Sequence, residues 1–261
     1  MRMRRKPWTE PMLEQCPFFI ERPSTHIGQW QAFFERRQPV HLEIGCGKGV
    51  ATARMACENP GINYIAIDEV RHVLAVTVKN IRAAYGETEP KNIVLSAVDA
   101  MMIHDTFCAA DGIERIYISF CNPWDERAKH HKRRLTHPRQ LMQYRAFMKP
   151  GGEIWFKTDD DALFTASKRY FGACGFEIAY LTDDLHASGF APNYVSEHEQ
   201  LYAAQGKKIH FMIAKMVPPQ GTRETDTNQN GGTPMSSFFE NNRERLEQFT
   251  RVSGSVGARA D

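Results

Sequence analysis

Short apolar segments alternate with longer amphipathic ones along most of the chain. Runs rich in β-branched and aromatic residues predict strands at 40–45, 63–68, 92–98, 115–120, 153–158, 176–181 and 208–215. Helical spacing predicts helices at 50–58, 70–85, 138–148 and 162–174, and a shorter one at 29–37. Strands that alternate with helices form βαβ units. The pattern therefore predicts a doubly wound, mostly parallel α/β sheet.

The two ends of the chain lack this alternation. Residues 1–25 combine basic residues with prolines, so we expect no fixed structure there before a partner binds. After Val217, the segment PPQGTRETDTNQNGGTP has the composition of a linker, and only a short amphipathic helix is expected, within 236–250. The expected organisation is a flexible basic arm (1–25), one α/β domain (26–216) and a disordered tail (217–261).

Composition excludes several classes of protein. With 42% hydrophobic and 25% charged residues, the chain is typical of a soluble globular protein. No apolar run approaches the roughly 18 residues that a membrane span needs, and the basic N-terminus has no apolar core behind it, unlike a secretory signal. The six cysteines form no Cys-x-x-Cys pair, so we expect no metal site and a reducing, cytoplasmic location.

One stretch, IYISFCNPWDERAKHHKRRL at 116–135, concentrates chemistry. A buried strand leads into Asn122-Pro123, a dipeptide that starts a turn, followed by Trp124 and a basic run. The net charge is only +2, so any nucleic-acid partner must be bound by such local clusters. Ligands of open α/β sheets bind at the carboxyl ends of strands. The stretch favours a site for a polyanion with a stackable group, although a plain turn with a solvated basic face would have the same sequence.

A glycine-rich segment follows the first predicted strand of the domain. Gly45, Gly47 and Gly49 alternate with other residues directly after that strand, and a missing Cβ lets the backbone pass close to a ligand. Val50 occupies the place where a dinucleotide fingerprint requires glycine, which argues against NAD. The loop can instead lie along an adenosine with a sulfonium substituent.

Acidic residues end the same strands. Asp68 follows the glycine segment by about 20 residues, the spacing at which a carboxylate meets ribose hydroxyls. Asp99 is placed to meet an adenine edge, and Glu43 can hold water or a methionine ammonium group. Each acid alone is often only a helix cap. Together with the glycine segment they predict an S-adenosylmethionine site.

Residues 3–215 resemble the bacterial tRNA (guanine-N7-)-methyltransferase family. The segments that carry this resemblance are RMRRKPW, LEIGCGKG, IAIDE, SAVDA, ISFCNPW with HHKRRLTHPRQL, GGEIWFKTDD and SEHEQLYAAQGKKIHF. The resemblance implies a seven-stranded class I methyltransferase fold with an antiparallel last strand, and N7-methylguanosine at position 46 of the tRNA variable loop as product. It implies cofactor contacts from Glu43, Asp68, Asp99 and Asn122, substrate contacts from Asp159 and the segment Ser196 to Glu199, and tRNA phosphate contacts from Arg127, Lys132, Arg133 and Arg134.

The chain departs from the family pattern at three places. Many members have Asp-Pro-Trp where this chain has Asn122-Pro123-Trp124, and many place a lysine where Glu126 stands. Arg127, one residue later, is a candidate replacement cation. Ser196 is more often threonine, which keeps the hydroxyl.

Guanine N7 has an in-plane lone pair and no proton, so its methylation needs positioning and no general base. We therefore expect Asn122 to hold the methionine end of the cofactor or the guanine edge. Asp159 and Glu199 are candidates to accept from guanine N1–H and N2–H2. Two other functions stay open: an amino methyltransferase, because Asn-Pro-Trp is similar to the Asn-Pro-Pro-Tyr motif, and a non-catalytic RNA-binding protein. The sequence does not distinguish a monomer from a homodimer.

Overall fold

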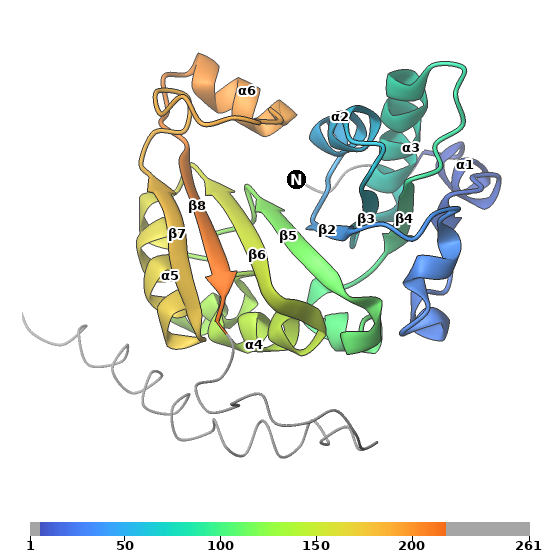
Figure 1. Cartoon of the computed structure of the whole chain (residues 1–261). Coiled ribbons are helices and arrows are strands. Elements are labelled where there is room, and N and C mark those ends of the chain that lie inside the picture. Colours follow the sequence, from blue (N-terminus) through green and yellow to red (C-terminus); the bar gives the residue numbers. More distant parts are fainter. Residues whose placement is uncertain (1–5, 218–261) are drawn as a thin grey trace, which may run out of the picture. The chain divides into compact units, whose positions relative to one another are not determined.

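The computed structural model describes residues 6–217, which form a single eight-stranded sheet flanked by helices (Figure 1). The strands are β1 (Phe19–Ile20), β2 (Val40–Ile44), β3 (Asn63–Asp68), β4 (Ile93–Ala97), β5 (Ile113–Ser119), β6 (Met148–Thr158), β7 (Phe176–Thr182) and β8 (His210–Met216). Their order across the sheet is β1-β4-β3-β2-β5-β6-β8-β7. The pairs from β1 to β6 are parallel, and β8 is antiparallel to both β6 and β7.

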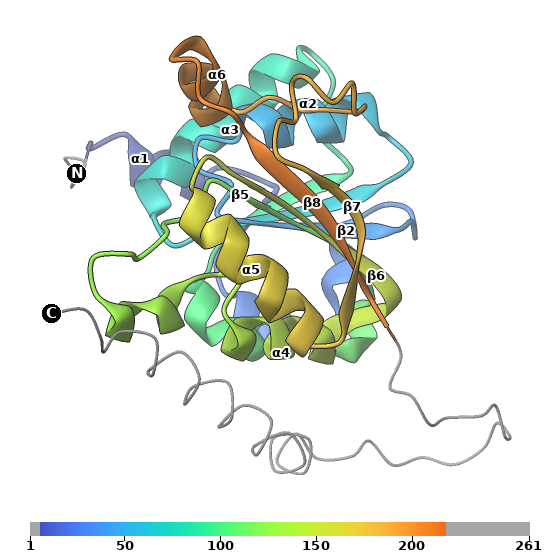
Figure 2. The same ribbon diagram turned by 90° about the vertical axis from the view of Figure 1, so that its left-hand side faces the viewer.

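Helices cover both faces of the sheet, with α2 and α3 on one face and α4 and α5 on the other (Figures 1 and 2). The α-helices are α1 (Thr9–Glu14), α2 (Val50–Glu58), α3 (Arg71–Tyr85), α4 (Pro138–Phe147), α5 (Asp161–Ala173) and α6 (Glu197–Ala204). Short 3-10 helices are η1 (Pro23–His26), η2 (Trp30–Phe33), η3 (Ala100–Asp105), η4 (Ala109–Asp111) and η5 (Ala128–Arg133). This arrangement confirms the predicted doubly wound, mostly parallel α/β fold with an antiparallel last strand.

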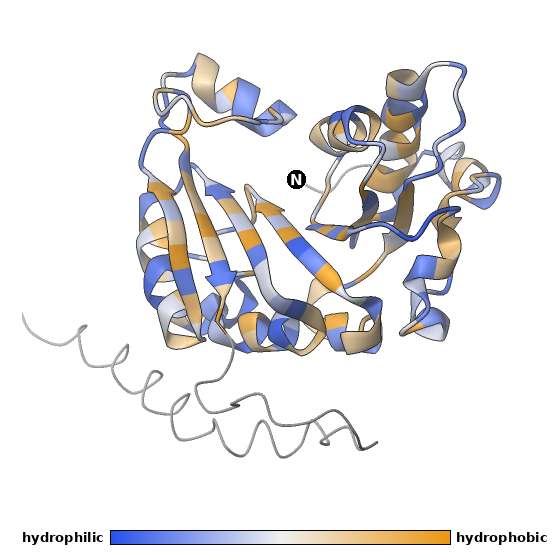
Figure 3. Ribbon diagram, in the orientation of Figure 1, coloured by the Kyte–Doolittle hydropathy of each residue, from blue (hydrophilic) through white to orange (hydrophobic). Residues whose placement is uncertain are grey.

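The central strands of the sheet are buried, and Figure 3 shows that most of their residues are apolar, with polar ones between them. All five residues of β2 are buried, including His41 and Glu43, and so are the first five of β3. Parallel strands with helices on both faces are buried in this way, because neither face meets water. The positions of β2 and β3 are therefore determined by burial, which places the residues that follow them at the edge of the sheet.

Most predicted boundaries agree with the structure to within a few residues. The helix at 50–58 and the strand at 63–68 match residue for residue. The helix expected at 29–37 is wrong, since that region forms only the 3-10 helix η2. β6 begins at Met148, five residues before its predicted start, and α1, α6 and the eighth strand, β1, were not expected.

The expectation of an unstructured arm is wrong for residues 6–25. Leu13 and Phe18 are buried in the main core, and β1 pairs in parallel with β4, Phe19 opposite Leu95. Arg71 on α3 pairs with Glu10 at 2.7 Å and with Glu21 at 2.9 Å. The apolar residues between the prolines pack on α3 and β4. The local sequence does not show this packing, because α3 and β4 come later in the chain.

Residues 1–5 and 218–261 lie outside the described residues. The predicted tail after Val217, with its helix within 236–250, falls almost wholly in the second of these ranges. Between residues 6 and 217, no helix combines the length and the apolar character that a membrane span requires.

Candidate active site

A cleft of about 990 Å³ opens at the carboxyl ends of the parallel strands. This volume suits a small-molecule ligand such as a nucleoside cofactor. All residues predicted to contact the cofactor line it: Glu43, Gly45, Gly47, Gly49, Asp68, Asp99 and Asn122. They meet because parallel strands end at one edge of the sheet, where a doubly wound fold binds its ligands.

The glycine loop between β2 and α2 forms one wall of the cleft. Gly45, Gly47 and Gly49 have φ angles of 79°, 56° and 70°, which side chains other than glycine rarely adopt. A Cβ on Gly49 would lie 2.2 Å from Cγ2 of Thr77 on α3. A Cβ on Gly45 or Gly47 would meet no atom within 4 Å, so both face open space. Gly49 thus packs against α3, and the other two leave room for a ligand.

Asp68 and Asp99 order the backbone around the cleft. Asp68 accepts hydrogen bonds from the backbone N–H of Gly47 at 3.0 Å and of Val70 at 2.9 Å. Asp99 accepts from the N–H of Met101 at 2.8 Å, which starts η3. Burial raises the pKa of Asp68 above its ordinary value. These carboxylates therefore hold backbone N–H groups in place and also line the cleft, where a second lone pair on each oxygen remains for a ligand.

Glu43 lies deeper, and its side chain receives a hydrogen bond from the Thr52 hydroxyl on α2. Only 6% of Glu43 is exposed, and burial raises its pKa to about 7. The Thr52 hydrogen bond and the charge of Lys157 act in the opposite direction, and the Asp68 charge raises the pKa further. The charge of Glu43 therefore depends on neighbouring groups from three other elements.

Asn122 lies in a strained turn at the end of β5. Its Oδ1 accepts from the backbone N–H of Trp124 at 2.9 Å, which leaves the NH2 group to meet a ligand. Phe120 and Trp124 have φ angles of 53° and 49°, unusual for aromatic residues. Such strain on both sides of one residue is common at functional sites, where the surrounding structure maintains it.

Trp124 lies outside the hydrophobic core and lines the cleft. The guanidinium of Arg133 lies over its ring, 5.1 Å from the centroid, and Arg133 also lines the cleft. Arg127 and Lys132 are exposed but do not line it. Arg133 and Trp124 therefore form a cationic, stackable wall.

Arg134 differs from its neighbours in the basic run. Only 4% of it is exposed, and its Nε donates to the carbonyl oxygen of Pro123 at 2.6 Å. The structure therefore contradicts the expected phosphate contact for Arg134. Its side chain is used to hold the Asn122 turn against the start of α4.

A long connection between β7 and β8, residues 183–209, forms the opposite wall of the cleft; we call it the β7–β8 arm. Ser196 caps α6 by accepting from the backbone N–H of Glu199 at 3.2 Å, and it lines the cleft with Glu197 and His198. Glu197 forms an ion pair with Lys48 of the glycine loop at 2.9 Å. The arm thus contacts the cofactor loop across the cleft.

Two acids predicted to meet guanine do not line the cleft. Glu199 is fully buried, and its oxygens are held by Lys157 at 3.1 Å, Asn193 at 2.7 Å and His186 at 3.1 Å. In this structure Glu199 therefore has no exposed oxygen to offer to a guanine. Asp159 is bound by Lys207 at 2.7 Å. The neighbouring Asp160 caps α5.

Sequence reasoning missed Lys48, Lys157, Asn193 and Tyr194. The sequence did contain a sign that Lys157 has a special role: it is a charged residue near the end of a predicted strand, directly after the apolar residues Ile154, Trp155 and Phe156. No such signal exists for Asn193 and Tyr194, which lie in an irregular segment.

Comparisons with known proteins agree with this geometry. A family model described as a putative methyltransferase matches residues 37–212. The tRNA (guanine-N(7)-)-methyltransferase of Clostridium botulinum strain Eklund 17B is 51% identical over 216 residues, 82% of this chain and 98% of that protein. The protein with the same name from Acetivibrio thermocellus is 49% identical over 217 residues, 82% of this chain and 99% of its own length.

The chain belongs to the tRNA (guanine-N7-)-methyltransferase family. A solved structure of the 16S rRNA methyltransferase KamB, 11% identical, superposes with a TM-score of 0.53 over 73% of this chain and 93% of that one. That likeness shows the fold alone, and it confirms the class I methyltransferase architecture.

The cleft fits S-adenosylmethionine, the cofactor of this family. The open backbone at Gly45 and Gly47 leaves space for an adenosine, and Asp68, Asp99 and Glu43 line the same cleft. Among residues 6–217, no group of three or more metal-ligating side chains comes together.

Proposed function

We propose that this protein transfers the methyl group of S-adenosylmethionine to N7 of a guanosine in tRNA, at position 46 of the variable loop. The observation that carries the proposal is one cleft that joins two kinds of site. Its inner part has the glycine loop and acids of a cofactor pocket, and its rim has Asn122, Trp124, Arg133 and Ser196. The names of the closely related proteins support the same acceptor atom.

The residues of the cleft have positioning work to do. The cofactor supplies an electrophilic methyl group on a sulfonium centre, and guanine N7 needs no base to attack it. Trp124 offers a ring on which the base can stack, with the Arg133 charge beside it. Asn122 offers an NH2 donor at the junction of the two halves of the cleft, to the methionine end or to guanine O6. The rate then depends on holding N7 in line with the methyl group.

Selection of guanine falls to Asp159 in this proposal. Its ion pair with Lys207 lies at the surface, with 46% of the lysine side chain exposed, so a guanine edge can replace the lysine at low cost. Glu199 supports the arm from inside. Arg127, Lys132 and Arg133 are exposed and suit tRNA phosphates, which bind Lys and Arg through charge.

The decisive experiment mixes purified protein, unmodified tRNA transcript and methyl-labelled S-adenosylmethionine. Transfer of the label to tRNA is measured first, and the tRNA is then treated with borohydride and aniline, which cleave RNA at N7-methylguanosine. The expected result is a single cut in the variable loop. A matched transcript with adenosine at position 46 should take no label. Label without that cut would favour an amino methyltransferase, and no label despite binding of both ligands would favour a non-catalytic RNA-binding protein.

We also propose a cytoplasmic location. All six cysteines are free thiols in the structure, as suits a reducing compartment, and tRNA is the proposed partner. Fractionation of cells that express the chain would test this, with recovery outside the cytosol as the contrary result.

A further inference from the structure

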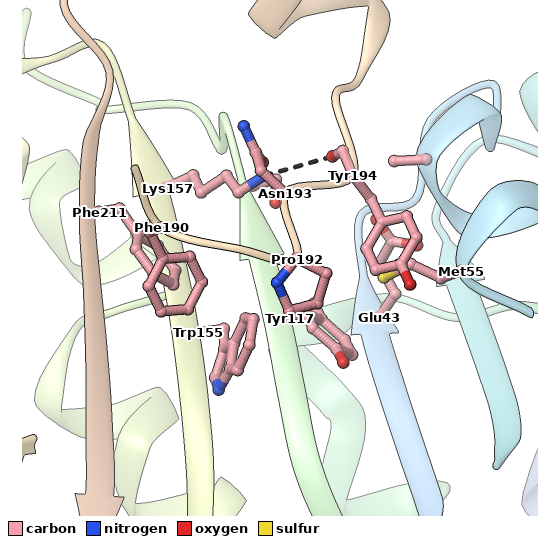
Figure 4. A pocket seen from close by; sticks show the side chains of 12 residues that line it. Glu43, Met55, Tyr117, Trp155, Lys157, Phe190, Pro192, Asn193, Tyr194 and Phe211 are labelled. Carbon is pink, nitrogen blue, oxygen red and sulfur yellow. Dashed lines mark hydrogen bonds between the residues drawn. The ribbon is translucent and has the colours of Figure 1, made fainter. Parts of the chain in front are cut away.

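Lys157 lines a small cavity that shares Glu43 with the cleft. Lys157 reaches from β6 toward Asn193 and Tyr194 of the β7–β8 arm, with Glu43 of β2 on the far side of a small cavity (Figure 4). It donates to Asn193 Oδ1, to the carbonyl oxygen of Tyr194 at 3.3 Å and to Glu199 Oε2 at 3.1 Å. One cation therefore ties three residues of the arm to the sheet.

The same ammonium acts on the cofactor acid. Both Lys157 and Glu43 line the small cavity, whose volume is about 20 Å³. Burial lowers the pKa of Lys157, and the charges of Glu199 and Glu43 oppose that change. Burial raises the pKa of Glu43, and the Thr52 hydrogen bond and the charge of Lys157 oppose that rise. Only 12% of the Lys157 side chain is exposed, so water screens these interactions weakly.

Four titratable groups surround the carboxyl group of Glu43. They are Lys157 of β6, Asp68 of β3, the Tyr117 hydroxyl of β5 and the Cys46 thiol of the glycine loop. Glu199, which pairs with Lys157, also contacts His186 at 3.1 Å. Among the described residues, Lys157 is therefore the lysine that acts on both Glu43 and Glu199.

We infer that Lys157 is a positioning residue that couples the two halves of the site: its charge favours the carboxylate form of Glu43 beside the cofactor, and its hydrogen bonds hold the arm that presents Ser196 to the substrate. The second part rests on the proposed function, and the first part does not. Lys157 makes no contact with the cleft itself. Its effect is exerted through Glu43, Asn193 and Glu199.

The test compares Lys157→Met, Lys157→Arg and the control Lys149→Met. Lys149 is on the same strand and also pairs with a glutamate, Glu114, but it lies far from the cleft lining. Cofactor affinity is measured without tRNA by calorimetry from pH 6 to pH 9, and kcat/KM is measured with tRNA. Melting temperatures are recorded for all variants.

The expected result is a pH-dependent loss of affinity. The pKa of Glu43 is about 7, and removing the cation raises it, so less carboxylate is present at neutral pH. For a rise of one unit, Kd for S-adenosylmethionine relative to wild type is about fivefold weaker at pH 7 and nearly unchanged at pH 9. The ratio cancels titration of the cofactor's own amine. We expect kcat/KM with tRNA to fall at least tenfold in Lys157→Met, part of it to return in Lys157→Arg, and Lys149→Met to match wild type.

A double variant distinguishes an effect of Lys157 on the cofactor site from an effect on the stability of the fold. Lys157→Met with Glu199→Gln removes both buried charges, so the melting temperature should recover while the affinity loss at pH 7 persists. Two results would overturn the inference: wild-type affinity for S-adenosylmethionine at pH 7 in the double variant, or wild-type affinity at that pH in Lys157→Met. If wild-type protein does not methylate tRNA, the proposed function fails, yet the cofactor titration still decides the first part.

Discussion

At the scale of single residues, this site depends on side chains that have two tasks. Asp68 accepts hydrogen bonds from the backbone of Gly47 and Val70 and also lines the cofactor cleft, and Asn122 closes a turn while its NH2 group remains for a ligand. A structural hydrogen bond and a ligand contact are compatible because carboxylate and amide groups offer several hydrogen-bonding positions. A structural role for such a residue therefore does not argue against a contact with the ligand.

Asn122→Ala should lower the single-turnover methylation rate about tenfold or more. The change removes the hydrogen bond to the Trp124 backbone, and the strained turn then relaxes away from the geometry that holds N7 near the methyl group. Asp125→Ala, at an exposed neighbour, is the control and should act like wild type. An unchanged rate in Asn122→Ala would remove Asn122 from the mechanism.

At the scale of elements, the basic run after Trp124 divides by burial. Lys132 and Arg133, in η5, are exposed, whereas Arg134, one residue beyond, is buried under the turn it supports. Arg134 follows the last residue of η5 and has an extended backbone, with φ of −63° and ψ of 134°, so its side chain does not continue the exposed face of the helix. One run of like charges thus contains both exposed members and a buried, structural one.

Salt dependence should separate these members. Lys132→Ala and Arg133→Ala should each weaken tRNA binding and lower the slope of log Kd against log salt by about one. Arg134→Ala should keep the slope and instead lower the free energy of unfolding by about 1–3 kcal/mol, because it leaves the Pro123 carbonyl without its donor. Fluorescence anisotropy at several KCl concentrations, with urea unfolding, checks both. Equal slopes for all three variants would refute the division.

At the scale of the whole molecule, the N-terminal segment belongs to the folded unit. α1 packs on α3, and β1 extends the sheet beyond β4, which covers part of an otherwise open sheet edge. Lys79 of α3 lies 3.8 Å from the ring centroid of Trp8, so the segment is also attached by a cation–π contact. The segment from residue 6 onward is therefore attached to α3 and β4.

Leu13→Ala tests this attachment. Leu13 is 1% exposed, so truncation should cost about 2–5 kcal/mol of unfolding free energy, as for other core leucines. Glu14→Ala, next to it and exposed, should change stability by less than about 0.5 kcal/mol. Urea unfolding of both variants gives the comparison. Two neutral variants would mean that the segment is detached in solution.

The sequence by itself determined the order of strands and helices, the glycine loop and the acids at the strand ends. These features are local: a period of hydrophobic residues defines each element, and parallel strands bring their carboxyl ends to one edge whatever the details of packing. Glu43, Asp68, Asp99 and Asn122 were therefore found without coordinates, and all four line one cleft.

Only the tertiary structure decided which polar residues are buried and which acids remain available. Arg134 and Glu199 have ordinary polar neighbours in sequence, yet both are buried, and the partner of Glu199, Lys157, lies 42 positions away. Order in residues 6–25 likewise depends on α3 and β4, which come later in the chain. Burial and ion pairing depend on which distant surfaces meet, and no local period of the sequence records that meeting.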